Sequence, residues 1–393
     1  MKRIVDVVNF NADASCLSSR EWLDVLAGGD NSSFVRWLKL YVDLDRKVVL
    51  GFPGATVADI AVHNPEAIGF INRHQDIFEI ILRPFAHDIA LLRQGNGFLV
   101  NFDLGCEAIQ REFKNISPYF LPPEFMLTNE QIVQLADRNV AGVFINPARF
   151  SADLKGRIPA APYMIRGLFG VTMKCIPFRG KLTNSYLQAL QMFDCSGWNE
   201  GILSSADEVV FTWRDGESSF LLPEGRLRES FWLENELDSI SRQHIGTLDL
   251  DFTSNESLEA HHYRSYPVHS FSAWMKEFRM LGFINRVQKV EECLERMTPE
   301  QVGYWLMIIN SDIMSSIEKR SPVVSMKSSP CSDKIFDFTI QRSERGFEGE
   351  EYLVTIEASL RDSKIPEYLS ASLEAHLRKL RGRLEYLVPC RRM

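Results

Sequence analysis

The sequence predicts a parallel α/β barrel, followed by a helical region and a small C-terminal α+β appendage. Short apolar segments that stop at proline, glycine or polar residues alternate with helical patterns up to about residue 225. Such alternation implies right-handed β-α crossovers, which make successive strands parallel. The strand segments are numerous and show no repeat period, and this favours a barrel over an open sheet.

The strands of the barrel can be placed in order along the chain. The first is an apolar run that ends in the polar cluster Asn9, Asn11 and Asp13. The second stops at Pro53-Gly54, because proline cannot donate to a strand ladder. Helical patterns separate each later strand from the next. The predicted strands are residues 3–10, 47–52, 77–82, 117–121, 141–145, 173–177 and 208–213.

The pattern changes beyond residue 225. Long amphipathic helical patterns follow at residues 231–243, 270–280, 283–296 and 299–320. A Ser- and Pro-containing stretch, residues 321–333, has the composition of a linker or surface loop. The expected divisions are a barrel over residues 1–225, a helical region packed on it over 226–325, and a strand-strand-helix appendage over 326–393.

Composition narrows the class of protein. The net charge of −8 and the pI near 5.6 argue against a nucleic-acid backbone as partner. The seven cysteines form no Cys-x-x-Cys pair, as expected for reduced thiols in a cytoplasmic protein. No stretch approaches the roughly 18 apolar residues of a membrane span. Neither a membrane partner nor a signal peptide is expected.

A carboxylate follows the fourth predicted strand directly. The apolar residues 119–121 run into Pro122-Pro123, and Glu124 comes next. Thr128 then has the character of a helix N-cap. Glu124 is therefore predicted just past the carboxyl end of a strand, where parallel α/β folds carry out chemistry. The alternative is a solvated loop residue.

A second acidic segment follows the last predicted strand and has the same anatomy. Arg214-Asp215-Gly216-Glu217 lies at the end of the apolar run 208–213. Two carboxylates on different strands at one rim are what glycosidic-bond cleavage requires, since one attacks the anomeric carbon and the other protonates the leaving oxygen. Asp215 is preferred to Glu217 as the acid because it is nearer the strand end. The alternative is a tight turn that serves only backbone geometry.

These segments resemble the motifs of glycoside hydrolase family 57, whose α-amylases, 4-α-glucanotransferases and branching enzymes share a (β/α)7 barrel. The glucanotransferase-like branch is nearest. The resemblance rests on the order and spacing of short motifs over residues 4–320: Val49–Gly54, Asn64-Pro65-Glu66, Ile77–Ile80 with Pro84–His87, Leu121–Glu124, Asp215–Glu217, Tyr266–Ser270 and Asn310–Asp312. It implies that Glu124 is the nucleophile of a retaining mechanism and Asp215 the acid/base, with an oligosaccharide substrate and no cofactor.

The first family motif, His-x-His-Gln-Pro, is absent. Asn9-Phe10-Asn11-Ala12-Asp13 stands in its place. Amides and a carboxylate can bind sugar hydroxyls without titrating near neutral pH, so Asn9, Asn11 and Asp13 are expected to line the pocket and favour a sugar other than plain α-1,4-glucan. The further substrate-binding candidates are Glu79, His87, Trp213, Arg214, Glu217 and Asp312.

The function predicted from these residues is a retaining glycoside hydrolase or transferase acting on α-linked sugars. Asp215 is expected to have less polar surroundings than Glu124, because an acid must hold its proton near neutral pH. Loss of the first-motif histidines motivates the alternative of a catalytically inactive carbohydrate-binding or scaffold protein. A deacetylase would need an Asp-Asp pair and a His-x3-His motif, which the sequence lacks. His261-His262 have no third ligand at suitable spacing, so no metal site is expected.

Overall fold

The computed structural model describes residues 1–11, 19–93, 96–145, 161–166, 168–221, 224–252 and 278–309. Asp13, Asp312, the His261-His262 pair and the predicted appendage at 326–393 lie outside these residues. The strands are β1 (Lys2–Asn9), β2 (Val48–Gly51), β3 (Phe78–Leu82), β4 (Ile116–Phe120), β5 (Gly142–Ile145), β6 (Tyr163–Arg166), β7 (Thr172–Pro177), β8 (Val209–Asp215) and β9 (Ile240–Arg242). The α-helices are α1 (Ser19–Leu26), α2 (Ser33–Asp43), α3 (Gly54–His63), α4 (Pro65–Arg73), α5 (Gly97–Glu112), α6 (Asn129–Ala136), α7 (Gly180–Met192), α8 (Ser196–Leu203), α9 (Ser218–Leu221), α10 (Gly225–Glu234), α11 (Phe278–Glu291) and α12 (Pro299–Ile308).

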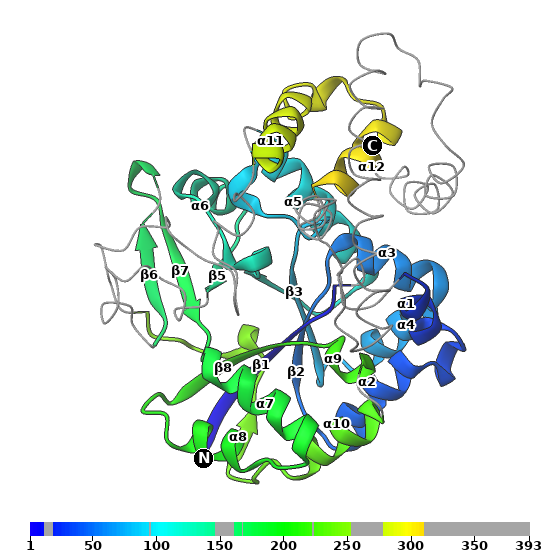
Figure 1. Ribbon diagram of the computed structural model, residues 1–393. Helices are drawn as coiled ribbons and strands as arrows, with labels where there is room; N and C mark the ends of the chain where they lie inside the picture. Colours follow the sequence, from blue (N-terminus) through cyan, green and yellow to red (C-terminus); the bar gives the residue numbers. More distant parts are fainter. Residues whose placement is uncertain are drawn as a thin grey trace, which may run out of the picture.

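The strands form one largely parallel sheet in the order β6-β7-β5-β4-β3-β2-β1-β8 (Figure 1). All seven predicted strands are present, as β1 to β5, β7 and β8, and each pairs in parallel with its neighbours among them. β6 adds an antiparallel edge beside β7. A backbone hydrogen bond from Arg179 N to Phe211 O, 2.9 Å long, joins the chain just after β7 to β8. The predicted α/β fold class, a mostly parallel sheet with helices, is confirmed for the described residues, although the order of paired strands has two ends and the sheet is not closed.

Alternation along each strand separates an inward from an outward face. On β1, Val5 and Val7 point inward, whereas Ile4 and Val8 pack under the surrounding helices. The inward residues of the sheet pack together in a cluster that we call the barrel interior: Val5, Val7, Val49, Ile81, Tyr119, Leu121, Phe144, Ile176, Phe178, Val209 and Phe211. The same alternation carries Asn9 and Asp215 onto the inward face at the last positions of their strands.

The helices cover the outward face. α1 to α4 and α10 lie along one side of the sheet in Figure 1, and α11 lies beside α5. The Gln288 side chain of α11 donates to Leu92 O at 3.0 Å, which ties this helix to the segment between β3 and α5. No helix in the described part of the chain is long and apolar enough to cross a membrane.

The chain departs from prediction after α10. A helix was expected over residues 231–243, but α10 ends at Glu234 and β9 follows. Ile240 pairs with Lys2, so β9 extends the sheet beyond the predicted barrel boundary at residue 225. Tertiary contacts outweigh the local helical pattern here, because the Arg242 side chain is buried against Asp6 and Glu236.

Candidate active site

Glu124 lies in a tight turn immediately beyond β4. Pro122 and Pro123 end the strand, and the 3-10 turn η3 (Pro123–Phe125) follows. Glu124 (φ 53°) and Phe125 (φ 55°) both have left-handed backbone conformations. Each costs an L-residue about 1–2 kcal/mol, and such strained positions cluster at functional sites. Three residues after this turn, Thr128 caps α6 in a capping box with Gln131.

Asp215 and Glu217 follow at the end of β8. Asp215 pairs in register with Asn9, whose Nδ2 donates to Asp215 Oδ1 at 3.5 Å. The exposed Asp215 side chain is followed by Gly216, where a Cβ would overlap the ring of Phe10. Glu217 is buried and accepts a hydrogen bond from the backbone N–H of Asn11. The two carboxyl groups thus lie beside the end of β1, that of Asp215 exposed and that of Glu217 buried.

Arg83 connects these carboxylates with Glu124. It continues the inward face of β3 and is 1% exposed, with Nη1 donating to Leu121 O at 2.5 Å. Burial lowers the pKa of Arg83 to about 10, against the opposing charges of Asp215, Glu124 and Glu217. One guanidinium therefore lies within electrostatic reach of all three carboxyl groups. We call this cluster, formed by Asn9, Asn11, Arg83, Glu124, Asp215 and Glu217, the carboxyl edge.

The environments of the two β8 carboxyl groups differ from expectation. Burial, together with the charge of Asp215, raises the pKa of Glu217 to about 8, although the hydrogen bond from Asn11 and the charge of Arg83 oppose the shift. Asp215 is exposed whereas Glu124 is half-buried, so the expectation that Asp215 has less polar surroundings than Glu124 is wrong. The shielded carboxyl group at this edge is that of Glu217. β8 ends with Asp215 at the rim, and Glu217 is buried just beyond Gly216, whose Cα lies close against the ring of Phe10.

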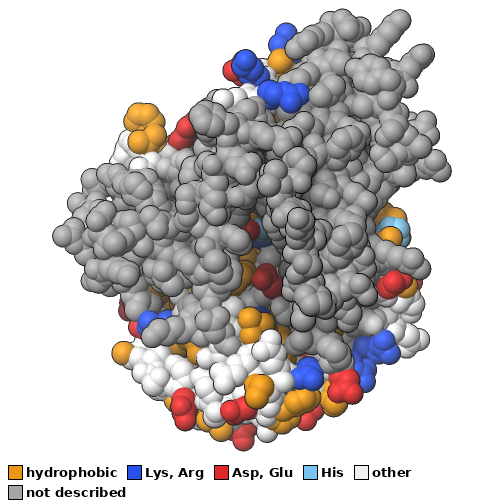
Figure 2. Space-filling view, viewed as in Figure 1, with side chains coloured by type: hydrophobic (Ala, Val, Ile, Leu, Met, Phe, Trp, Pro, Cys, Tyr) orange, Lys and Arg blue, Asp and Glu red, His pale blue; other side chains and the backbone are white. Residues whose placement is uncertain are grey.

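Trp213 joins the ends of β4 and β8. Its half-buried side chain lies on the inward face and packs edge-on against Phe125, with 5.1 Å between ring centroids. Phe125 directly follows Glu124, so this contact brings the Glu124 turn next to β8. Thr183 of α7 donates to Trp213 O at 2.5 Å and holds the strand from the outside. Figure 2 shows acidic side chains recessed near the centre of the viewed face.

Glu79 is at a different depth. It faces inward as predicted, but it precedes Arg83 by four residues, about 13 Å toward the amino end of β3. Its carboxylate accepts hydrogen bonds from Ser117 Oγ (2.5 Å), Ile245 N (2.6 Å) and Gly246 N (2.8 Å). These contacts bind Glu79 to the segment after β9, and the structure does not place it at the carboxyl edge.

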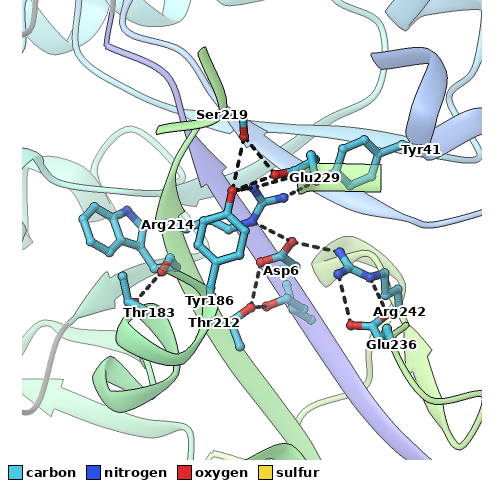
Figure 3. A network of polar contacts seen from close by, with 12 residues as sticks. Asp6, Tyr41, Thr183, Tyr186, Thr212, Arg214, Ser219, Glu229, Glu236 and Arg242 are labelled. Atoms are coloured by element: carbon cyan, nitrogen blue, oxygen red, sulfur yellow. Dashed lines mark hydrogen bonds and ion pairs between the residues drawn. The ribbon is translucent and has the colours of Figure 1, made fainter. Parts of the chain in front are cut away.

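Arg214 points away from the carboxyl edge, into a buried network of ion pairs (Figure 3). Its Nε lies 3.1 Å from Asp6 Oδ2 and its Nη1 lies 3.0 Å from Glu229 Oε1. Burial would raise the pKa of Asp6, but the charges of Arg214 and Arg242 outweigh it and hold that pKa below its ordinary value. Because neighbouring strand residues face opposite ways, Arg214 cannot share the inward face with Asp215. It anchors β8 instead of contacting the site.

His87 is buried in the segment that leaves β3 beyond the carboxyl edge. The next residue, Asp88, lies 3.6 Å from Arg93 Nε and belongs to a buried ion cluster with Glu291 of α11. Burial raises the pKa of Asp88 to about 7. Within the described residues, no group of three or more His, Cys, Asp or Glu side chains is arranged to hold a metal ion.

Several buried polar atoms of the carboxyl edge are unpartnered. Within the described ranges, Asn9 Oδ1 and Asn11 Oδ1 accept no hydrogen bond, and Arg83 Nε and Nη2 donate none. Buried polar groups are normally satisfied, so such atoms mark a place where a polar ligand is expected. Sequence reasoning singled out Asn9 and Asn11 but missed Arg83. Alternation along β3 could have identified Arg83, because residues 79, 81 and 83 share the inward face and 83 follows the end of the strand.

Comparison with solved structures shows the same fold in known enzymes. A GH57-type branching enzyme from Pyrococcus horikoshii matches with a TM-score of 0.63 and 10% identity, over 98% of this chain and 95% of that one. A 4-α-glucanotransferase from Thermococcus litoralis matches with a TM-score of 0.60 and 13% identity, over 80% of this chain and 56% of that one. An α-amylase from Thermotoga maritima matches with a TM-score of 0.56 and 10% identity, over 99% and 97%. The structural resemblance to family 57 enzymes agrees with the resemblance of the motifs.

The other two comparisons give no match. No family model matches the sequence, and neither does any curated protein. The likeness to solved structures therefore establishes the fold, over nearly the whole length of the branching enzyme and just over half that of the glucanotransferase.

Proposed function

We propose that this protein is a glycoside hydrolase or transglycosidase that acts on α-linked sugars through a glycosyl-enzyme intermediate. The observation that carries the proposal is that Glu124 and Asp215 lie at the ends of two strands that meet through the contact of Phe125 with Trp213, and that the charges of both act on the buried guanidinium of Arg83. The strained backbone of Glu124 and the unpartnered amide oxygens beside Asp215 support it. The solved structures that share the fold include a branching enzyme, a glucanotransferase and an amylase.

Each residue has a defined part in this reaction. Glu124 attacks the anomeric carbon while Asp215 gives a proton to the departing glycosidic oxygen. Asp215 then takes a proton from water or an acceptor sugar, whose oxygen displaces Glu124. The exposed position of Asp215 suits this second step, because the acceptor arrives from solvent.

Arg83 and Glu217 set the electrostatics of the site. The positive charge of Arg83 offsets the repulsion between the carboxylates that surround it. Glu217 has a pKa of about 8, so it holds a proton at neutral pH and adds little negative charge. It then supports the chain at Asn11 and leaves the acid/base role to Asp215.

A second candidate function is carbohydrate binding without turnover. Asn9 and Asn11 occupy the positions where the family motif has histidines, and both leave a buried amide oxygen without a donor. These oxygens suit sugar hydroxyls whether or not a bond is cleaved.

Kinetics of two substitutions separates the candidates. Glu124→Gln is expected to abolish turnover, because the amide cannot form the covalent intermediate. Asp215→Asn is expected to block natural substrates and to spare 4-nitrophenyl glycosides, whose leaving group needs no proton. The matched control is Glu130→Gln in α6, an exposed carboxylate near Glu124 in sequence, which should behave as wild type. Sugar binding with no turnover in wild type would favour the binding protein.

A further inference from the structure

Arg83 presents one edge of its guanidinium without any partner. Nη1 is held by Leu121 O, whereas Nε and Nη2 donate to no atom of the described residues although both are buried. These two nitrogens form the side of the guanidinium from which two N–H groups project in parallel. The buried guanidinium is thus hydrogen-bonded at one nitrogen and has no acceptor along one edge. Burial of these unpaired N–H groups costs free energy unless a ligand binds there.

The atoms around this edge restrict what it binds. A pair of parallel N–H groups suits two adjacent oxygen acceptors, which are either a carboxylate or phosphate, or two neighbouring hydroxyl groups. Asn9 Oδ1 and Asn11 Oδ1 are acceptors without donors in the same cluster, so the ligand must also donate hydrogen bonds. A hydroxyl both accepts and donates, whereas an ionised carboxylate only accepts.

Charge decides between the two. The charges of Asp215 and Glu124 act on Arg83 directly, so the guanidinium is already surrounded by negative groups. An anionic substituent at the buried edge of Arg83 would meet these carboxylates as like charges, which repel it. A neutral ligand would not.

We propose that Arg83 is a specificity-determining residue that binds two adjacent hydroxyl oxygens of a neutral sugar through Nε–H and Nη2–H. The inference rests on the proposed function, since it assigns the sugar held between Glu124 and Asp215. It makes the substrate a neutral pyranoside with a vicinal diol and excludes uronic acids and sugar phosphates at this position.

The test is a double-mutant cycle between the arginine and the sugar hydroxyls. Wild type and Arg83→Lys are compared on 4-nitrophenyl α-glycosides of glucose, mannose, galactose and glucuronic acid, and on monodeoxy analogues of the preferred sugar. Lysine keeps the charge but loses the two parallel donors. Arg36→Lys on the exposed surface of α2 is the matched control and should equal wild type.

For wild type, kcat/KM is expected to be about 10- to 100-fold lower on an analogue that lacks either hydroxyl than on the parent sugar. This factor corresponds to one charge-assisted hydrogen bond. Arg83→Lys should lose as much on the parent sugar and little more on that analogue. A general structural fault would instead lower all substrates by one factor. Additive losses, or no discrimination by wild type against any monodeoxy analogue, would overturn the proposal.

The remaining outcomes separate this inference from the proposed function. Preference for the glucuronide, lost in Arg83→Lys, means that Arg83 binds an anion and contradicts the neutral-sugar assignment. Turnover that depends on Glu124 but not on Arg83 leaves the function standing and refutes the inference. Where no glycoside is cleaved, binding of the methyl α-glycosides is followed by the intrinsic tryptophan fluorescence of the protein. Failure to bind any of them counts against both.

Discussion

Glu217 holds its proton at a pH where carboxyl groups are normally ionised. Its pKa of about 8 reflects its burial and the charge of Asp215, two residues away. The arrangement separates two carboxyl groups on one turn into an ionisable residue at the rim and a neutral one below it. Acid and base roles in enzymes are commonly assigned by such differences in environment.

The stability of the protein should therefore depend on the Glu217 proton. The folded pKa of about 8 lies above the ordinary 4.5, so the folded state binds the proton more tightly than the unfolded state does. The resulting stabilisation is present below about pH 4.5 and is lost as pH rises through 8, with a slope of at most about 1.4 kcal/mol per pH unit. Urea unfolding of Glu217→Gln should lack this loss relative to wild type. An identical pH dependence in both proteins would contradict the assignment.

The segment from Arg83 to Asp88 takes its shape from its contact with α5. A Cβ at Gly105 would overlap backbone atoms of Arg83, Pro84 and Phe85. Asn101 of the same helix donates to Ala86 O at 3.1 Å and accepts from Ala86 N at 2.7 Å. The backbone contacts of α5 therefore hold the turn that begins with Arg83 at the carboxyl edge.

Substitution of Gly105 should damage both stability and the site. We expect Gly105→Ala to destabilise the fold by about 1–3 kcal/mol, because backbone must move to admit the methyl group. It should also lower activity by displacing Arg83. Gly69→Ala in α4, where only the Arg73 side chain is near at 3.4 Å, should be neutral or stabilising by about 0.5–1 kcal/mol. Thermal unfolding of the two variants makes the comparison, and equal effects would refute the close-packing argument.

α11 is attached to the barrel by a buried ion pair between Arg93 and Glu291. Trp305 of α12 donates to the same carboxylate at 3.1 Å, so one side chain holds both helices. Breaking such a pair leaves a charge without its partner in a buried position.

We expect Glu291→Gln to destabilise the protein by about 3–5 kcal/mol. Hydrogen exchange should then rise first in α11 and α12, while β1 to β5 stay protected. The exposed Glu295→Gln is the matched control, since its only described contact of this kind is with the exposed Asn96. Uniform loss of protection across the sheet would show that these helices are part of one cooperative unit instead.

Short sequence patterns predicted the strands of the parallel sheet. Each strand combines an apolar run with a nearby breaker, such as Pro53 after β2 or Pro122 after β4. β9 had no such signal, because its place is set by pairing with Lys2–Ile4 at the far end of the chain. Local patterns therefore reveal strands that end themselves and miss strands that depend on a distant partner.

The carboxyl edge was predicted in part. The ends of β1, β4 and β8 identified Asn9, Glu124 and Asp215, because parallel strands finish at one edge. The position of a side chain along its strand, and the face of the sheet on which it lies, were harder to assign. Glu79 has the inward facing of Arg83 but lies four residues deeper, and Arg214 is one residue out of phase with Asp215. Strand alternation, applied to the sequence, would have excluded Arg214 and indicated Arg83. Only the tertiary structure shows that the Glu79 carboxylate accepts hydrogen bonds from Gly246 and Ile245.

The proposed function requires that Glu124 forms a covalent bond with the sugar. This bond is detected by the intact and peptide mass of the protein after incubation with a panel of 5-fluoro-α-glycosyl fluorides. These reagents carry a leaving group that needs no acid, and their fluorine slows breakdown of the glycosyl-enzyme. We expect a mass increase of one fluorosugar on the peptide that contains Glu124, in wild type and in Asp215→Asn, and none in Glu124→Gln. A label on another residue, or turnover without any label, would contradict it.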